Sequence, residues 1–248
     1  MHQPLKHSPT ISIVIPCYNE ADTIGDCLAA ISHQTDMPDE VIVVDNNCID
    51  ETIAVAKRYS FVRVIQETQQ GRSFARNRGF NEASGDILAR IDADTILPPH
   101  WVGILRNYYA THGVSMLHGI AGSATFDTPN QHVGFMMGKL IFNGFFFPVS
   151  QAMLRSPTLF GSNMAITHKA WQAIADKVCT DDNAIHEDID LSVHLLEEGG
   201  TISKKRLPDV SVSSRSMIET PAKFWWRLKV WPTPVIRHQK RNLFSKKH

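Results

Sequence analysis

The sequence predicts an α/β fold whose N-terminal half is built on a mostly parallel sheet. Apolar runs rich in β-branched residues alternate with segments of helical periodicity between residues 10 and 98. Because two parallel strands need a crossover connection, usually a helix, this alternation is typical of parallel sheets. Ligands of such sheets bind outside the carboxyl ends of the strands, so the candidate functional residues are those that follow each strand.

The first strand and helix are predicted from residue type and spacing. Thr10–Pro16 is a short β-branched run closed by proline, which indicates a buried strand. Asn19 can cap the helix that follows, in which Ile24, Leu28 and Ile31 recur at helical spacing.

The same alternation continues to Asp92. Strands are expected at residues 40–45, 62–67 and 87–91, and helices at residues 50–59 and 71–84. Tyr18, Asp45 and Asp92 lie at or just beyond the ends of three of the four strands. The segment up to about Pro98 is therefore predicted to be a nucleotide-binding half.

The second half of the chain has a less regular pattern. Residues 98–112 predict a helix with proline tolerated in its first turn. Residues 115–126 and 159–166 predict strands interrupted by glycine. Residues 186–200 predict a helix with acids in its first turn and glycine at its end.

No linker separates the two halves. We expect one domain over residues 1–220, with a nucleotide-binding half at about 10–98 and an acceptor-binding half at about 99–220. Residues 221–248 form a basic, aromatic C-terminal extension, because eight Lys and Arg residues and no acid follow Glu219.

Composition narrows the class of protein. Of the 248 residues, 43% are hydrophobic and 20% are charged, as in ordinary globular proteins. The formal net charge is zero, so no nucleic-acid partner is indicated. The four cysteines lack zinc-site spacing and are expected to be reduced thiols in the cytoplasm. No signal peptide and no run of 18 apolar residues is seen, so a spanning helix is not expected.

Two acids at the end of a buried strand raise the question of their partner. Asp92 and Asp94 are separated only by Ala93 and can converge on one object if the chain turns there. Carboxylate pairs of this kind suit Mg²⁺ or Mn²⁺ shared with substrate phosphates. An alternative is that Asp94 caps the next helix while Asp92 is a turn residue.

A second alternative is the DxDx[TV] motif of haloacid-dehalogenase phosphatases. Here Thr95 comes one place too early, and the acids follow the fourth strand instead of the first. The pattern therefore gives little support to the phosphatase alternative.

Five segments, in order, carry a more specific resemblance. They are "IPCYNE", "VVDNNCIDET", "GRSFARNRGFNEASGDILARIDADT", "GSNMAI" and "EDIDLS". Together they resemble the family 2 glycosyltransferases, which have the GT-A fold, over roughly Ile11–Arg215. The resemblance implies inverting transfer of a sugar from a nucleoside-diphosphate donor. It also implies that Asp92 and Asp94, with Ala93 between them, bind the donor and hold a divalent cation on its pyrophosphate.

The resemblance places further residues around the nucleotide. Pro16, Tyr18 and Glu20 match the loop after the first strand, although Pro16 can simply end the strand and Glu20 can simply favour the helix N-terminus. Asp45 matches the carboxylate that accepts an N–H of uracil, which implies a UDP-sugar. The family often has two acids here, but Asn46 follows, so only Asp45 is carried over.

The segment "GRSFARNRG" supplies groups that suit phosphates. Gly71 permits close approach of the backbone, and Arg72 and Arg76 can each bind a phosphate with two parallel hydrogen bonds. These two arginines are four residues apart and share a helix face, whereas Arg78 is expected to be solvated.

Inverting transfer needs a base, and the acidic helix start offers Glu187, Asp188 and Asp190. On a helix of about 100° per residue, Asp188 lies roughly 65° from the centre of the apolar arc, and the other two lie more than about 130° away. Asp188 is therefore expected to face inward, where desolvation raises its pKa. The family pattern also gives the base role to this aspartate, with Glu187 beside it in the catalytic set.

The sequence therefore predicts a metal-dependent, inverting glycosyltransferase, a hexosyltransferase that uses a UDP-sugar. Its acceptor is expected to be a glycan or a lipid-linked hydroxyl compound of cell-envelope polysaccharide synthesis. One alternative is a nucleotidyltransferase, which needs no base on the acidic helix. Another is a catalytically silent nucleotide-sugar-binding module, against which the intact Asp92, Asp94 and Asp188 argue.

The C-terminal extension predicts a peripheral membrane contact at the inner face of the membrane. Aromatic and apolar residues from Phe224 to Trp231 mix with Lys223, Arg227 and Lys229, which is the composition of an interfacial helix on an anionic surface. The apolar run at residues 138–154 can add to this contact but is expected to be too short and interrupted to span. The alternative is that the tryptophans pack on the protein body.

Overall fold

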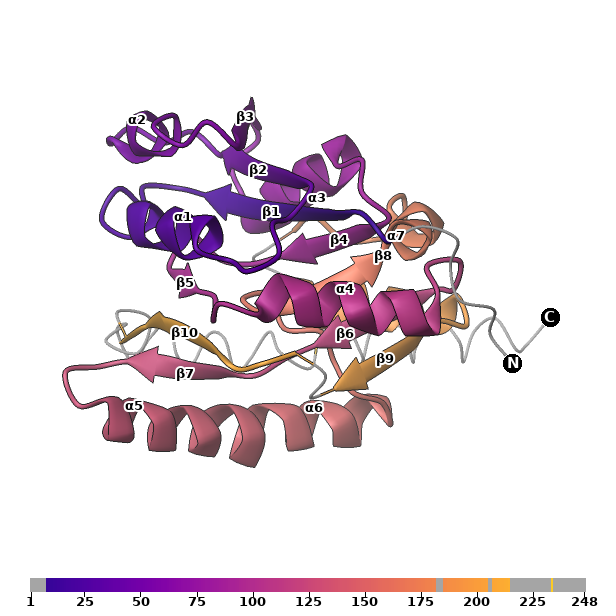
Figure 1. Ribbon diagram of the computed structural model, residues 1–248. Coiled ribbons are helices and arrows are strands. Elements are labelled where there is room, and N and C mark those ends of the chain that lie inside the picture. The colour runs from indigo at the N-terminus through magenta and orange to yellow at the C-terminus, as the bar shows by residue number, and fades with distance from the viewer. Residues whose placement is uncertain (1–7, 182–184, 205–206, 215–232, 234–248) are drawn as a thin grey trace.

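A seven-stranded sheet runs through the molecule, and a three-stranded sheet lies beside it (Figure 1). The structure, a computed structural model, describes residues 8–181, 185–204, 207–214 and 233. The large sheet has the order β3-β2-β1-β4-β8-β6-β9, and the small sheet has the order β5-β10-β7. The predicted C-terminal extension lies outside the described residues, apart from Thr233.

The N-terminal half confirms the predicted alternation. Its strands are β1 (Ile11–Cys17), β2 (Glu40–Asp45), β3 (Val62–Gln66) and β4 (Ile87–Arg90), and its helices are α1 (Ile24–Ser32), α2 (Thr52–Ala56) and α3 (Arg72–Glu82). β1 pairs in parallel with β2 on one side and with β4 on the other, and β3 pairs in parallel with β2. The carboxyl ends of these strands therefore share one edge of the sheet.

Alternation along β1 assigns the helices to the two faces of the sheet. Ile13 and Ile15 belong to the core that includes α1 and α4 (Trp101–His112), whereas Val14 packs on the other side with Ala75 and Phe80 of α3. The approach of α3 is close at Gly79, where a Cβ atom would lie 2.2 Å from Val14 Cγ1. A side chain at this position would push α3 off the sheet.

One predicted cap is wrong. Asn19 does not begin α1, because its backbone adopts a left-handed conformation with φ of 56°. Its Oδ1 instead accepts the N–H of Ile49 at 2.9 Å. The side chain thus ties the loop after β1 to the loop after β2, and α1 starts beyond Thr23.

The second half extends the same sheet with mixed direction. Its strands are β6 (His118–Ala121), β8 (Met164–Thr167) and β9 (Thr201–Lys204), and its helices on this part are α7 (His168–Ile174) and α8 (Glu187–Glu197). β8 runs antiparallel to both β4 and β6. Because β8 is shorter than predicted, residues 159–163 form a loop beside the carboxyl end of β4.

The small sheet is made from segments far apart in the chain. β5 (Thr95–Ile96) pairs antiparallel with β10 (Val210–Ser213), which pairs in parallel with β7 (Ala124–Asp127). β5 begins directly after the Asp92–Asp94 turn, so its pairing with β10 fixes the chain on that side of the turn.

A long helix covers the small sheet, at the bottom of Figure 1. It consists of α5 (Gln131–Gly138), the π-helical segment η1 (Lys139–Phe146) and α6 (Phe147–Leu154). Asn130 caps it by accepting two backbone N–H groups. The expectation of an interrupted run was wrong, because these segments form one helix of 24 residues that is long and apolar enough to cross a membrane by length and composition.

Candidate functional site

The carboxyl end of β4 brings together the two acidic segments that the sequence indicated. Arg90, the last residue of β4, is only 3% exposed. Its Nη2 donates to Asp92 Oδ1 at 2.9 Å, and its Nη1 donates to Asp188 Oδ1 at 2.7 Å. Glu187 Oε1 lies 3.7 Å from the same Nη2. One buried guanidinium therefore joins the Asp-Ala-Asp turn to the acidic start of α8.

The turn at Ala93 forms as the sequence required. The N–H of Thr95 donates to the backbone carbonyl of Asp92 at 3.0 Å, so the chain reverses direction between the two acids. Ala93 is buried, whereas Asp92 and Asp94 are half-buried. The alternative in which Asp94 caps the next helix is wrong, because α4 starts at Trp101 and its N-cap residue is His100.

The two aspartates fit a divalent cation that arrives with a diphosphate. Within residues 8–181, 185–204, 207–214 and 233, no group of three His, Cys, Asp or Glu side chains is placed to hold a metal by itself. The Asp92 side chain remains 38% exposed although it accepts hydrogen bonds from Arg90 and Ser162. Carboxylate oxygens are the ligands that Mg²⁺ and Mn²⁺ prefer, and substrate phosphates commonly complete such sites. Asp92 and Asp94 suit that arrangement.

The loop Gly161–Asn163 closes the cluster from the side of β8. The Gly161 N–H donates to Asp188 Oδ2 at 2.8 Å. A Cβ atom on Gly161 would lie 2.5 Å from Arg90 Nη1, so any side chain at this position would displace the buried guanidinium. Asn163 fixes the loop by accepting from Trp101 Nε1 at 2.9 Å and by donating to two backbone carbonyls.

The burial of the three acids of α8 differs from what the helical wheel predicted. Glu187, Asp188 and Asp190 are all buried, because α8 is covered on every side in its first turn. Asp190 accepts the N–H of Cys179 at 2.8 Å and lies 3.6 Å from His194, so it serves the fold. The expectation that Glu187 and Asp190 face away from the core was wrong.

The surroundings shift the pKa values of the two catalytic candidates, Asp188 and Glu187, in opposite directions. Burial raises the pKa of Asp188 above its usual range, although Arg90 opposes the shift. Burial would also raise the pKa of Glu187, but Arg72 and the other positive neighbours hold it well below its usual range. Among the described residues, Glu187 Oε2 is a buried oxygen without a hydrogen-bond partner.

The two arginines of α3 share a face, as predicted, but only one is accessible. Arg72 is exposed, and its Nη1 lies 3.4 Å from Glu187 Oε1. Arg76 is fully buried, and its Nη1 donates to the backbone carbonyl of Glu187 at 3.0 Å. A direct phosphate contact from Arg76 is therefore not available, and this expectation is corrected: Arg76 holds α8 against α3. Arg78 is exposed and pairs with Glu82, which fits the solvated position predicted for it.

The predicted nucleotide residues lie at the same edge of the sheet. Tyr18 is exposed, and Pro16 is the penultimate residue of β1, opposite Val44. Asp45 ends β2, and its Oδ1 accepts the N–H of Cys48 at 2.8 Å. Glu20 accepts from Thr23 Oγ1 at 2.9 Å.

Asn46 has a role that the sequence reasoning missed. This buried side chain donates to the carbonyls of Glu67 and Gln69, and it accepts the N–H of Gly71 at 2.8 Å. Gly71 precedes α3 with φ of 151°, a conformation that favours glycine. Asn46 thus sets the loop that presents Arg72. The sequence signal for this role of Asn46 was its position directly after Asp45 at the end of β2.

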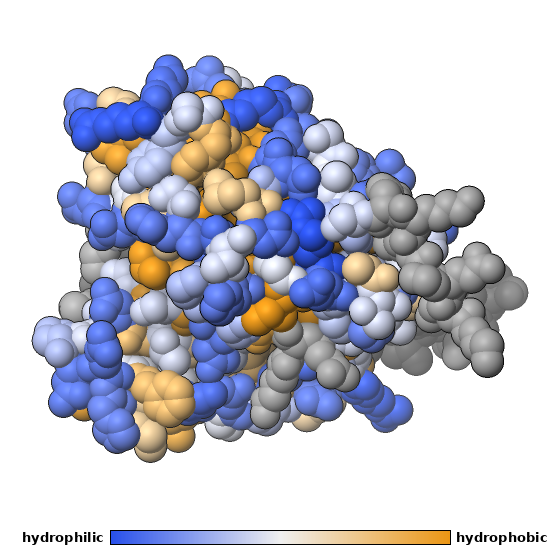
Figure 2. Space-filling model, in the orientation of Figure 1, coloured by the Kyte–Doolittle hydropathy of each residue, from blue (hydrophilic) through white to orange (hydrophobic). Residues whose placement is uncertain are grey.

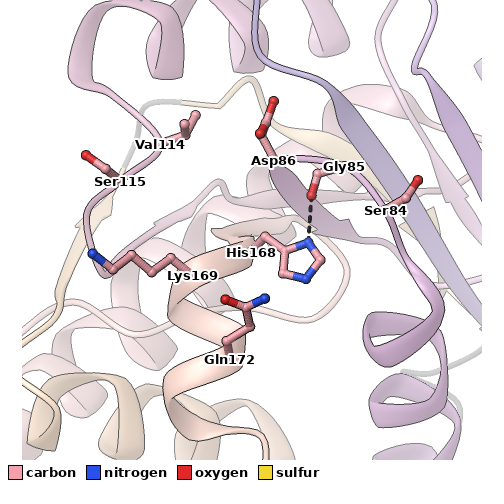
Figure 3. Close-up of a pocket in the computed structure, with 8 residues that line it drawn as sticks. All are labelled: Ser84, Gly85, Asp86, Val114, Ser115, His168, Lys169 and Gln172. Carbon is pink, nitrogen blue, oxygen red and sulfur yellow. Dashed lines mark hydrogen bonds between the residues drawn. The ribbon is translucent and has the colours of Figure 1, made fainter.

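A separate pocket opens at the opposite edge of the large sheet (Figure 3). Its cavity volume is about 240 Å³, and its lining residues are Ser84, Gly85, Asp86, Val114, Ser115, His168, Lys169 and Gln172. His168 Nδ1 lies 2.9 Å from the Gly85 carbonyl oxygen. Because this pocket stands at the amino end of β4, it is not part of the Arg90 cluster.

Comparisons with known proteins agree with this geometry. The family model described as Glycosyl transferase family 2 matches residues 12–170. The glycosyltransferase AglE of Haloferax volcanii is 36% identical over 134 residues, which cover 49% of this chain and 41% of that protein. The chain therefore spans less than half the length of that relative.

Two solved structures have a similar fold. The mannosyltransferase PcManGT from Pyrobaculum calidifontis, in complex with GDP-Man and Mn²⁺, aligns with a TM-score of 0.63 at 19% identity, over 90% of this chain and 61% of that chain. Glucosyl-3-phosphoglycerate synthase from Mycobacterium tuberculosis, in complex with Mn²⁺, UDP and glucosyl-3-phosphoglycerate, aligns with a TM-score of 0.62 at 21% identity, over 88% and 75% of the two chains. At these identities the likeness concerns the fold.

The family match contains both the Asp92–Asp94 turn and the Gly161–Asn163 loop. It argues against the phosphatase alternative and confirms the family that the sequence segments resemble. With its mixed α/β sheet in the GT-A arrangement, this chain belongs to glycosyl transferase family 2.

Proposed function

We propose that this protein transfers a sugar from a UDP-sugar to a hydroxyl group of a glycan or lipid-linked acceptor, with inversion at the anomeric carbon. The observation that carries the proposal is the Arg90 guanidinium, which binds Asp92 and Asp188 at once. It joins a carboxylate pair suited to a metal–diphosphate group to a buried carboxylate suited to proton transfer. Transfer from a diphosphate donor to a hydroxyl needs both functions in one site.

The donor is proposed to lie along the carboxyl ends of β2, β1 and β4. Asp45 would accept an N–H of uracil, and Arg72, which is exposed beside Glu187, would meet the diphosphate. The residues proposed to bind the nucleotide-sugar are Pro16, Tyr18, Glu20, Asp45, Gly71, Arg72, Asp92, Ala93 and Asp94. Arg76 supports this set from the buried side of α3.

Asp92 and Asp94 would hold Mg²⁺ or Mn²⁺. When bound, such a cation stabilises the negative charge of the departing diphosphate. Arg90 Nη2 donates to Asp92 Oδ1 at 2.9 Å and so orients this carboxylate.

Asp188 is proposed to be the general base. Its carboxylate takes the proton of the acceptor hydroxyl while that oxygen forms a bond to the anomeric carbon and the bond from this carbon to the diphosphate breaks. The raised pKa of Asp188, caused by burial, suits a group that must accept a proton. Glu187, with one buried oxygen lacking a partner among the described residues, is proposed to orient a sugar hydroxyl.

The reaction is proposed to take place at the cytoplasmic face of a membrane, in synthesis of cell-envelope polysaccharide. All four cysteines are free thiols, which is usual in the cytoplasm. The basic extension at residues 221–248 is proposed to contact an anionic surface. Its test is flotation with anionic vesicles of the full chain and of a chain ending at Thr220, and equal flotation of both would remove this contribution.

Thermal unfolding with a panel of nucleotide-sugars and Mn²⁺ tests the donor. A donor at 100 times its Kd adds about 2.7 kcal/mol to the free energy of unfolding. We expect UDP-sugars to stabilise the protein and GDP-sugars to have a smaller effect. Stabilisation by GDP-sugars alone would contradict the assignment of Asp45.

Two alternatives predict different products. A nucleotidyltransferase would release pyrophosphate from a nucleoside triphosphate and a sugar phosphate. A silent binding module would bind the donor but would neither transfer the sugar nor slowly hydrolyse the donor. Slow, Mn²⁺-dependent release of UDP without an acceptor supports the proposed transfer reaction over both.

A further inference from the structure

The long helix Gln131–Leu154 presents an apolar face to solvent. Of the ten exposed large hydrophobic side chains in the described residues, half lie on this helix. They are Val133, Phe135, Met136, Leu140 and Phe145, and Leu140 is 72% exposed. Only 22% of the most apolar stretch of the helix is buried in the protein, so it is not an ordinary core helix.

The opposite side of the helix is fixed to the small sheet. A Cβ atom on Gly134 would lie 2.0 Å from the Phe126 carbonyl oxygen, and one on Gly138 would lie 2.6 Å from that of Ala124. The helix backbone therefore presses directly on β7. Val133, Met136 and Leu140 follow the i, i+3, i+7 spacing along the other side. Lipid can reach one side of this helix but cannot surround it.

The helix and the segment after it contain no acidic residue. From residue 128 to residue 175 the sequence contains no Asp or Glu, whereas Lys139, Arg155 and Lys169 lie in the same segment. Lys139 Nζ pairs with Asp209 Oδ2 at 2.8 Å, and Arg155 follows the end of the helix. An apolar helix face without an acid of its own suits an anionic bilayer.

The helix also touches the proposed base helix. Phe146, Val149 and Met153 pack on Ile189 and Val193 of α8. A contact with lipid on the outer side would therefore lie next to the element that carries Asp188.

Figure 2 shows the mostly hydrophilic face of the molecule over α1 and α4, with hydrophobic residues at its lower rim over α5.

We infer that the exposed face of Gln131–Leu154 docks this protein flat on an anionic lipid bilayer. The helix lies in the interface, with its glycine side on β7 and its Met136–Leu140 side in the headgroup region. Docking there places the membrane against the helix that packs on α8, which carries Asp188. The inference of a lipid-linked acceptor rests on the proposed transfer reaction, whereas bilayer binding does not.

The test is flotation of the full chain with phosphatidylglycerol vesicles and, separately, with phosphatidylcholine vesicles. We expect binding to the anionic vesicles that weakens at high salt. The double variant Met136→Glu/Leu140→Glu should bind at least about tenfold more weakly, because it puts two charges into the apolar contact. The control Met37→Glu/Ile104→Glu changes the net charge equally at exposed sites away from the helix and should stay within about twofold of the parent.

Three outcomes would overturn the inference. One is equal binding by the helix variant and the parent chain, and another is absence of parent binding at low salt. The third is a concentration-dependent dimer that the helix variant abolishes without lipid, since this would identify a second copy as the occupant. Soluble-donor hydrolysis by the same variants is measured in parallel. Retained hydrolysis with lost flotation separates failure of docking from failure of the proposed chemistry.

Discussion

Arg90 Nη1 lies 2.7 Å from Asp188 Oδ1, although the two residues are 98 positions apart in the chain. The other terminal nitrogen of the same guanidinium binds Asp92 at 2.9 Å. One buried guanidinium therefore joins the Asp92–Asp94 turn to the proposed base, and a change at one is expected to affect the other.

Replacing Asp92 or Asp94 by Asn is expected to reduce transfer at least about a hundredfold, because stabilisation of the leaving diphosphate by a metal is worth several kcal/mol. Binding of UDP with Mn²⁺, measured by thermal shift, should weaken in parallel. Asp26→Asn, at an exposed position on α1, is the control. Full activity of Asp92→Asn or Asp94→Asn in excess chelator would contradict the assignment.

Asp188→Asn is expected to bind UDP-sugar and Mn²⁺ nearly normally but to lose about 10²–10⁴ in transfer rate, which is the usual contribution of a general base. Glu187→Gln should keep more activity and show a raised KM, because this residue is proposed to orient a hydroxyl. Single-turnover transfer and donor titration separate the two effects. An inactive Glu187→Gln beside an active Asp188→Asn would show that the base is Glu187.

Arg90→Met is expected to lower the free energy of unfolding by about 3–5 kcal/mol, because it leaves buried Asp188 without its counter-charge. The double variant Arg90→Met/Asp188→Asn should lose less than the sum of the two single changes. Urea unfolding of the four proteins gives the coupling. A strictly additive result would show that the two side chains are not an energetic unit.

Gly161→Ala should cost about 1–3 kcal/mol in stability and also disturb transfer, since its Cβ would lie 2.5 Å from Arg90 Nη1 and 2.9 Å from Asp188 Oδ1. Gly144→Ala is a matched control, because its nearest neighbour would be a Leu140 methyl group at 3.5 Å. The control should be neutral or slightly stabilising, as alanine is the better helix former. Equal unfolding midpoints for the two variants would refute the packing argument.

We expect His118, which lies on β6 outside the Arg90 cluster, to make stability depend on pH. Burial, with a smaller effect from His112, lowers its pKa below the usual 6.5, and its ring nitrogens bond Tyr108 and Thr201. Because the folded state disfavours the proton, this contribution to stability is full above pH 6.5 and declines as the pH falls through the lowered pKa. His118→Gln should flatten the loss of stability between about pH 7 and pH 5, as measured by urea unfolding. Identical pH profiles for variant and parent would contradict this.

Local patterns predicted much of the fold and part of the site. The alternation of β-branched runs and helical segments placed β1 to β4 and α1 to α3 correctly, because each buries one face against its neighbours. Asp92 and Asp94 were visible because two acids rarely follow an apolar strand. The apolar run at residues 138–154 was expected to be too short and interrupted to span a membrane. It is part of a helix of 24 residues, in which Gly134 and Gly138 permit contact with β7.

Side chains whose partners come from distant segments could not be assigned in this way. The spacing of Arg72 and Arg76 showed a shared helix face, but only the packing of α8 against α3 buries Arg76 and leaves Arg72 exposed. The helical wheel of α8 predicted that Asp188 faces inward more than Glu187 and Asp190 do. That prediction assumed that one side of the helix is exposed to solvent. Tertiary packing covers all three.

The sequence by itself determined the parallel half-sheet, the Asp-Ala-Asp turn at its edge and the family to which the chain belongs, because these depend on residue type and near-neighbour spacing. Only the tertiary structure decided that Arg90 joins Asp92 to Asp188, that Gly161 lies against the Arg90 guanidinium, and that one helix keeps its apolar side in solvent. These features depend on which segments meet across the sheet. A buried charge is stable only where such a meeting supplies its partner.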